Sequence, residues 1–166
     1  MAMTLTSASF SEGDLLGTDH ILSEAFGFGC SGGNLSPQLS WSGAPAGTES
    51  FALTCFDPDA PTGSGFWHWV VANIPADVTS LPLGAGDPAS GLMPAGALEV
   101  RTDFGKPGYG GPCPPQGANV HRYIFTLHAV GMKSLPVTAD TSAAIVGFYL
   151  NFNTLEKVSL IGLYRR

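Results

Sequence analysis

The sequence predicts one mainly β domain, residues 1–166, with one or two helices packed on it. Only 12% of the residues are charged, whereas 22 are glycine and 13 are proline. An average domain has about 25% charged residues. Several apolar runs have the length of β-strands and are separated by turn residues. No internal repeat or interdomain linker divides the 166 residues, which suffice for one hydrophobic core.

The first strands follow from alternating apolar residues. Residues 4–10 alternate weakly and suit an edge strand. In residues 51–57, the period of two places Phe51 and Asp57 on one face. Residues 66–74 are apolar on both faces, which is typical of a central strand. Strict alternation would give this strand one face with Phe66, His68, Val70, Ala72 and Ile74.

The second half of the chain alternates long loops with regular elements. Residues 103–119 consist largely of glycine, proline and other turn residues, and loops of this length are usually functional. Residues 121–130 form the strongest strand pattern, with His121 and Tyr123 on one face and His128 on the other. Shorter strands are expected at residues 97–101 and 158–164.

One helix is expected between the last two long strands. Apolar residues recur there at helical spacing, and Thr138, Asp140 or Thr141 could cap its first turn. The repeating residues are Ala144, Ile145, Phe148, Phe152 and Leu155.

Charge and composition exclude several classes of function. The net charge of −6 and pI near 4.9 disfavour binding to nucleic acid or to anionic membranes. No segment resembles a signal peptide or a membrane-spanning helix, so we expect a cytoplasmic protein. The three cysteines suit neither a disulfide scaffold nor a zinc site. Cys55 should be buried; Cys30 and Cys113 could pair, but reduced thiols are the favoured interpretation.

Polar side chains gather where the long strands meet loops. Asp57 and Asp59 follow one strand, His68 lies early in the next, and His121 and Tyr123 open the third. If these strands are neighbours, the two histidines and the tyrosine can donate hydrogen bonds to a small anion. Glycines at 108–111 could add backbone N–H groups. Asp57 would orient one histidine, while Asp59 would either contact the ligand or cap its own turn.

Four motifs in order give the chain a resemblance to the phosphatidylethanolamine-binding protein family, and especially to its bacterial, Raf-kinase-inhibitor-like branch. They are Asn34-Leu35-Ser36-Pro37-Gln38-Leu39-Ser40-Trp41, Asp57-Pro58-Asp59-Ala60-Pro61, Trp67-His68-Trp69, and Gly111-Pro112-Cys113-Pro114-Pro115-Gln116-Gly117 leading to His121-Arg122-Tyr123. The resemblance implies a β-sandwich of two packed antiparallel sheets with an anion-binding pocket at one end. By position, that pocket would be lined by Asp57, His68, His121 and Tyr123, with Pro61, Gly110 and Pro114 at its rim.

The resemblance also implies partners. Only residues 62–65 separate the Asp-Pro-Asp-Ala-Pro motif from Phe66, and the chain stops at Arg166, as in the short bacterial form. That branch commonly pairs as homodimers, and inhibition of a kinase or protease occurs among relatives.

Binding of a phosphate, phosphoryl headgroup or carboxylate is therefore the leading hypothesis, with no cofactor, no metal and no catalytic residue. A hydrolase with Ser36 or Tyr123 as nucleophile is one alternative. A metal site built from Asp57, Asp59, His68 and His121 is another.

Overall fold

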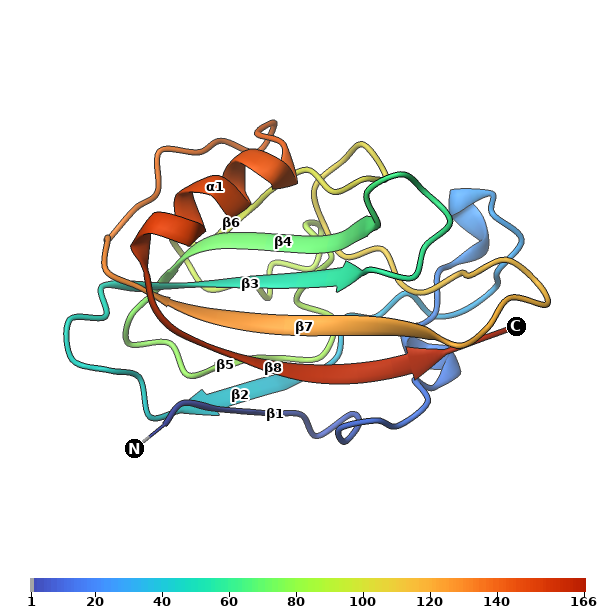
Figure 1. Cartoon of the computed structure of the whole chain (residues 1–166), viewed down its shortest axis with the longest axis horizontal. Helices are drawn as coiled ribbons and strands as arrows, with labels where there is room; N and C mark the ends of the chain where they lie inside the picture. The colour runs from blue at the N-terminus through green and yellow to red at the C-terminus, as the bar shows by residue number, and fades with distance from the viewer. Residues whose placement is uncertain (1) are drawn as a thin grey trace.

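The computed structural model describes residues 2–166 and shows the expected β-sandwich, with two antiparallel sheets (Figure 1). One sheet has five strands in the order β6-β4-β3-β7-β8, and the other has three in the order β1-β2-β5. The strands are β1 Thr4–Thr6, β2 Leu39–Ser42, β3 Ser50–Asp57, β4 Phe66–Pro75, β5 Ser80–Leu81, β6 Leu98–Glu99, β7 His121–Val130 and β8 Thr154–Tyr164.

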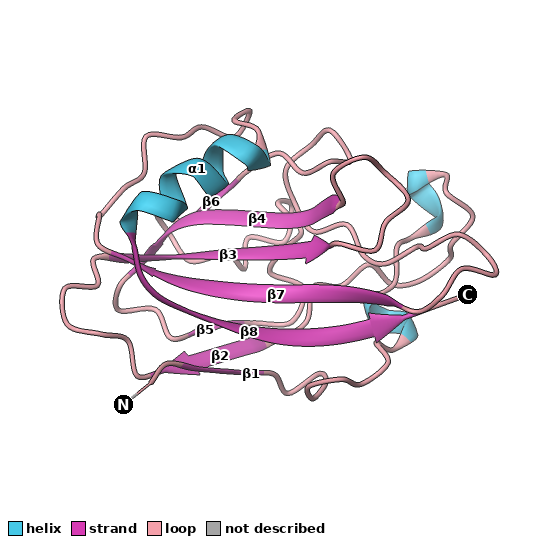
Figure 2. Cartoon of the chain, viewed as in Figure 1, coloured by secondary structure: helices cyan, strands magenta, loops and turns pink. Residues whose placement is uncertain are grey.

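Helices are few and peripheral (Figure 2). The α-helix α1 spans Ala143–Asn153 and lies against the outer face of the five-stranded sheet. Two single-turn 3₁₀ helices, η1 Thr18–His20 and η2 Glu24–Phe26, belong to the loops at the opposite end. Within residues 2–166, no helix is long and apolar enough to cross a membrane.

The strand expected at residues 121–130 is confirmed as β7. The last strand, β8, begins at Thr154, four residues earlier than expected. The β7 and β8 strands pair along their whole length, from His121 opposite Tyr164 to Val130 opposite Thr154. Because β3 pairs with both β4 and β7, the ends of these three strands lie side by side. Residues 57, 68 and 121 thereby approach one another from distant parts of the sequence.

The main core lies between the two sheets. Leu53, Phe125 and Leu127 from the five-stranded sheet pack in one cluster with Leu39 and the other inward side chains of the smaller sheet. All four are fully buried. Burial of each such side chain contributes roughly 1.5–3 kcal/mol, so this layer fixes the frame on which the strand ends are held.

A β-bulge at His68 breaks the alternation expected for β4. Cys55 pairs with Trp69 and Phe56 pairs with Trp67, which leaves His68 as an extra residue on β4. A bulge of this kind redirects the side chains that follow it. Val70 and Ala72 consequently pack beneath α1, and Trp69 and Val71 pack in the main core. A second register shift, between the pairs Leu53–Val71 and Phe51–Ile74, turns Ile74 into the main core as well. The prediction that His68 shares one face with Val70, Ala72 and Ile74 was therefore wrong.

The α1 helix forms where expected but buries a different face. Its buried residues are Ala143, Val146 and Leu150. The predicted apolar repeat faces solvent instead, with Ala144, Ile145, Phe148 and Phe152 exposed on α1. Leu155, expected in the helix, lies on β8 and is also exposed. The N-cap is Ser142, whose side chain accepts a hydrogen bond from the Ile145 N–H. None of the three expected capping residues fills this position.

Candidate functional site

A cavity of about 180 Å³ opens at the end of the sandwich where β3 ends and where β4 and β7 begin. We call it the His68/His121 pocket. Among its walls are six of the eight residues expected from the sequence: Asp57, Pro61, His68, Pro114, His121 and Tyr123. The other lining residues are Leu22, Phe28, Ala60, Thr62, Phe66, Phe104, Cys113 and Pro115.

Asp57 and His121 form a buried hydrogen-bonded pair in the wall of this pocket. His121 Nδ1 lies 2.7 Å from Asp57 Oδ2, and the two side chains are only 5% and 3% exposed. The other carboxylate oxygen, Asp57 Oδ1, accepts the backbone N–H of Asp59 at 2.8 Å. An ionised carboxylate only accepts hydrogen bonds, so Nδ1 of His121 holds the proton. Asp57 thus orients the ring and leaves its Nε2 for a ligand.

His68 presents its ring to the same space through a different support. Its Nδ1 lies 2.6 Å from the carbonyl oxygen of Gly110, which can only accept, so Nδ1 is the protonated nitrogen. Burial lowers the pKa of His68 below its ordinary value, although the bond to Gly110 acts in the opposite direction. We conclude that the ring is neutral at neutral pH, with Nε2 as an acceptor until it takes a second proton.

The ring of Tyr123 lies close to both histidines. Its ring is 5.2 Å from that of His68 and 6.5 Å from that of His121, centroid to centroid. Burial raises the pKa of Tyr123 well above its ordinary value, and the nearby Asp57 raises it further. The side chain therefore remains a neutral phenol and supplies an apolar wall with a hydroxyl group.

Asp59 does not line the pocket, and it does not cap the turn after β3. Its carboxylate accepts three hydrogen bonds from Arg122, from the backbone N, Nε and Nη2, each at 2.9 Å. This bidentate pair lowers the pKa of Asp59. The turn after β3 is capped by Asp57, not by Asp59.

The prediction that backbone N–H groups at residues 108–111 form an anion-binding nest was also wrong. The N–H groups of Tyr109, Gly110 and Gly111 are bound by protein acceptors, namely Gly86 O, His68 O and Asn34 Oδ1. Glycine is required at 110 and 111 for another reason. A Cβ would come within 2.3 Å of the Phe104 ring at position 110 and within 2.1 Å of the His20 carbonyl oxygen at position 111. Gly110 thus supports the site from behind, through its carbonyl.

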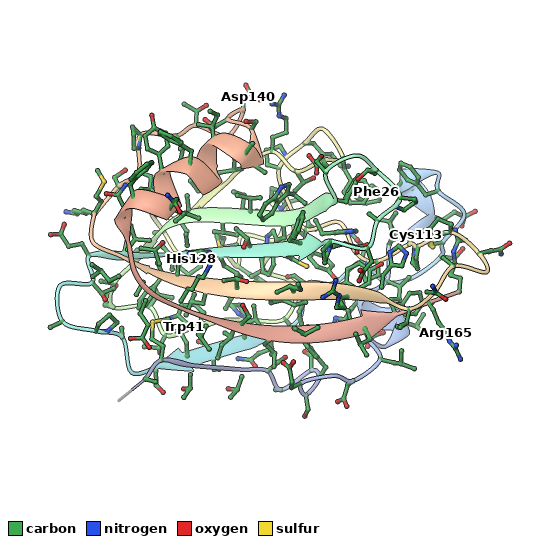
Figure 3. The ribbon with its side chains drawn as sticks, in the orientation of Figure 1. Phe26, Trp41, Cys113, His128, Asp140 and Arg165 are labelled. Atoms are coloured by element: carbon green, nitrogen blue, oxygen red, sulfur yellow. A yellow bond between two sulfur atoms is a disulfide. The ribbon has the colours of Figure 1, made fainter. Side chains whose placement is uncertain are left out.

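Two loops form the outer wall of the pocket and are linked covalently. Cys30 and Cys113 form a disulfide, with their Cα atoms 6.0 Å apart, so the preference for reduced thiols was wrong. Figure 3 shows Cys113 at the loop-rich end of the molecule, near Phe26. Arg166 joins the same two loops, because Nε donates to Pro114 O at 2.6 Å and Nη1 to Gly29 O at 3.3 Å. Cys55 is free and buried, as expected.

The aromatic part of the lining was missed by sequence reasoning. Phe104 is central to it, with its ring centroid 4.8 Å from that of Phe66, 5.8 Å from that of Phe28 and 5.5 Å from that of His68. Phe28 and Phe104 both lie in glycine-rich loops without periodicity, so no local signal pointed to them. Only the fold brings them beside the histidines.

A larger hollow of about 480 Å³ lies elsewhere, between α1 and the outer face of the sheet, and contains His128. His128 lies toward the opposite end of the molecule from Cys113 (Figure 3). Burial lowers the pKa of His128 to about 4, with a smaller effect of the nearby Lys157. Its Nδ1 is hydrogen-bonded to Thr154 Oγ1 at 3.1 Å. This hollow lacks a buried carboxylate–histidine pair, so the smaller pocket is the better candidate site.

Comparisons with known proteins agree with this architecture. The profile of the phosphatidylethanolamine-binding protein family matches residues 6–165. The Escherichia coli UPF0098 protein YbhB is 49% identical over 164 residues, which are 98% of this chain and 99% of YbhB. The UPF0098 protein YbcL of E. coli is 48% identical over 163 residues, which are 98% of this chain and 87% of YbcL.

Solved structures give the same result. The crystal structure of E. coli YbcL, described as a new member of the mammalian PEBP family, superimposes with a TM-score of 0.96 at 47% identity. The match covers 100% of this chain and 99% of that one. A homologue from Chlamydia trachomatis has a TM-score of 0.81 at 27% identity, over 99% of this chain and 98% of that one. The chain therefore belongs to the phosphatidylethanolamine-binding protein family.

Proposed function

We propose that the protein is a binding module that captures one small anionic group in the His68/His121 pocket. The observation that supports this most is the Asp57–His121 pair. With Nδ1 bound to the carboxylate at 2.7 Å, His121 has Nε2 free of any protein partner in the described chain. A second proton at Nε2 makes the ring a cationic donor, and Asp57 stabilises that charge.

His68 supports the same interpretation from β4, which lies on the other side of β3 from β7. Its Nε2 likewise has no protein partner among residues 2–166, and its ring also lines the cavity. The rings of both histidines therefore line one small pocket whose walls are mainly apolar. Charge-assisted hydrogen bonds are strong in such surroundings, so a carboxylate or phosphoryl group can bind without a basic protein surface.

We also propose that the pocket binds its ligand without catalysis. A hydrolase would need an activated nucleophile beside a base. Ser36 is buried away from the pocket, where its Oγ accepts the Gly86 N–H at 2.8 Å. Tyr123 is held as a neutral phenol, and the Thr62 hydroxyl donates to the Gly65 carbonyl at 2.5 Å. Within residues 2–166, neither the Tyr123 hydroxyl nor the Thr62 hydroxyl is hydrogen-bonded to a histidine.

The metal alternative has less support. Within residues 2–166, no group of three or more His, Cys, Asp or Glu side chains is placed to hold a metal ion. The carboxylate of Asp59 is bound to Arg122, and Asp57 is bound to His121. The four residues considered for a metal site therefore do not form a set of metal ligands.

Homodimer formation and inhibition of a kinase or protease remain proposals. Self-association is supported by the exposed apolar face of α1, since Phe148 and Phe152 are 57% and 69% exposed. For the location, disulfides persist mainly in oxidising compartments. The Cys30–Cys113 bond leads us to propose such a compartment in place of the cytoplasm.

A thermal-shift titration tests the proposed function. Acetate and phosphate, each compared with chloride at equal ionic strength, should raise the melting temperature of the wild type as the anion concentration rises. His121→Ala should abolish the rise, whereas His128→Ala, which lies outside the pocket, should retain it. Equal shifts in both variants, or no shift in the wild type at tens of millimolar anion, would refute the proposal.

A further inference from the structure

The aromatic lining of the pocket indicates the chemical class of the ligand in addition to its charge. We infer that the pocket selects a monoanionic group attached to an aromatic ring, such as an arylcarboxylate, over free phosphate. This inference rests on the proposed function, because the histidines must hold the anionic head. It adds that Phe28, Phe66 and Phe104 hold the body of the ligand.

The charges around the pocket favour one negative charge and not two. None of the lining residues is a lysine or arginine. The nearest guanidinium groups are already bound, that of Arg122 to Asp59 and that of Arg166 to two backbone carbonyls. The buried Asp57 offsets the charge of a protonated His121. A phosphomonoester carries about −1.5 to −2 at neutral pH, which this site does not balance.

The size of the pocket favours a ligand larger than an oxyanion. A water molecule in the liquid occupies about 30 Å³, so a cavity of about 180 Å³ exceeds the space of a carboxylate or phosphate. Sites for drug-sized ligands start near 300 Å³. The cavity thus fits a fragment of about one ring and one anionic group.

The walls define where such a ring would lie. Phe66 and Phe104 meet at 4.8 Å with their planes at 71°, and Phe104 meets Phe28 at 5.8 Å and 71°. These are edge-to-face contacts, the arrangement that aromatic pairs prefer. Phe104 therefore contacts both Phe28 and Phe66, and an aryl group of the ligand would add to this cluster.

Phe28 is the specificity-determining residue in this arrangement. Its side chain is 60% exposed although it lines the cavity, so a ligand would cover apolar surface that now contacts water. The disulfide holds the backbone of this segment near the pocket, with Cys113 Sγ 3.5 Å from Phe28 O. Phe28 is therefore positioned before the ligand arrives, which lowers the entropic cost of binding.

Calorimetric titrations with acetate, phenylacetate and inorganic phosphate test the inference. At pH 7 and equal ionic strength, phenylacetate should bind the wild type roughly ten- to a hundredfold more tightly than acetate, from the apolar surface that its ring buries. It should also bind more tightly than phosphate. Phe28→Ala should lose about five- to tenfold in phenylacetate affinity and much less in acetate affinity, and Phe28→Leu should lie between the wild type and Phe28→Ala.

Phe148→Ala is the matched control, since Phe148 is 57% exposed and also contacts other aromatic rings, but on α1. It should leave all affinities unchanged. If acetate binds through His121 but phenylacetate gains less than twofold, or if phosphate binds most tightly, the aromatic inference is overturned and the proposed function stands. If phenylacetate binds His121→Ala as well as it binds the wild type, and acetate and phosphate bind neither, the proposed function fails and the inference fails with it.

Discussion

His121 Nδ1 and Asp57 Oδ2 lie 2.7 Å apart although the two residues are separated by 64 positions in the sequence. The antiparallel pairing of β3 with β7 brings them together, because Asp57 ends one strand where His121 begins the other. Both side chains are almost fully buried. The pair fixes one free imidazole nitrogen in the pocket.

Asp57→Asn should weaken anion binding at least tenfold. The amide can donate from its NH₂ group to His121 Nδ1, which would favour the tautomer with the proton on Nε2. The neutral amide also no longer stabilises the protonated, cationic ring of His121. Loss of a buried charge-assisted hydrogen bond should also lower the free energy of unfolding by about 1.5–3 kcal/mol. Acetate titrations and urea unfolding measure the two effects. Asp59→Asn is the control, because its partner Arg122 is exposed; a loss of binding as large as that of Asp57→Asn would contradict the account.

Ligand affinity should rise as the pH falls from about 7.5 to 5. Burial lowers the pKa of His68, so the free pocket takes up a proton at Nε2 with difficulty. A bound anion favours the protonated ring, and the affinity therefore increases as the pH falls through the pKa of the complex and levels off below that of the free protein. Isothermal titration of acetate in buffers of different ionisation enthalpy measures the proton uptake. His68→Asn should flatten the profile; an equally steep profile in that variant would show that His68 is not the titrating group.

Glu99→Gln should stabilise the protein at pH 8. Burial raises the pKa of Glu99 from 4.5 to about 7, although the hydrogen bond from Trp69 Nε1 opposes the shift. The folded state thus binds the Glu99 proton more tightly than the unfolded state does. The stability that this proton contributes is complete below pH 4.5 and is lost as the pH rises through 7. The full difference would be about 3 kcal/mol, but the carboxyl group is partly exposed, so we expect about 1 kcal/mol.

Urea unfolding at pH 4 and pH 8 provides the check. Glu99→Gln should be neutral at pH 4 and stabilising at pH 8, because the amide oxygen can still accept from Trp69. Glu49→Gln, at an exposed position, should show no such difference between the two pH values. A Glu99→Gln protein no more stable than wild type at pH 8 would contradict the assignment.

Removal of the disulfide should destabilise the protein strongly. Cys30 and Cys113 are separated by 83 positions, and in the chain-entropy model a loop of this length contributes about 4–5 kcal/mol. The double variant Cys30→Ser/Cys113→Ser should therefore unfold at a lower urea concentration than the wild type. Dithiothreitol should lower the stability of the wild type toward that of the double variant and leave the variant unchanged. If it has no effect on the wild type, the two cysteines are not bonded in the folded protein.

The sequence predicted the long strands well because their pattern is local. Residues 121–130 alternate over ten positions, and β7 has those bounds. The bulge at His68 was not predictable, since alternation assumes one residue opposite one, and only the pairing of Cys55 with Trp69 reveals the extra residue. The buried face of α1 was missed for a related reason. Ile145, Phe148 and Phe152 have helical spacing, but so have the residues that are buried, Ala143, Val146 and Leu150.

The polar half of the pocket was predictable and the apolar half was not. Asp57, His68 and His121 lie at strand ends, where a polar residue in an apolar run is conspicuous. Phe28 and Phe104 come from loops whose course depends on long-range contacts, and phenylalanine in a loop gives no signal of its own. The Cys30–Cys113 bond is a contact of the same kind, because nothing in the local sequence of either cysteine names its partner.

The most direct test of the account is ¹⁵N NMR of the imidazole side chains during titration with acetate at pH 6.5. We predict that Nε2 of His121 moves toward the shift of a protonated, hydrogen-bonded nitrogen, while Nδ1 remains protonated by its bond to Asp57. His128, outside the pocket, should not respond. If the Nε2 signal of His121 is unchanged at saturating anion, or moves no more than that of His128, the pocket does not bind anions through this histidine and the central claim is wrong.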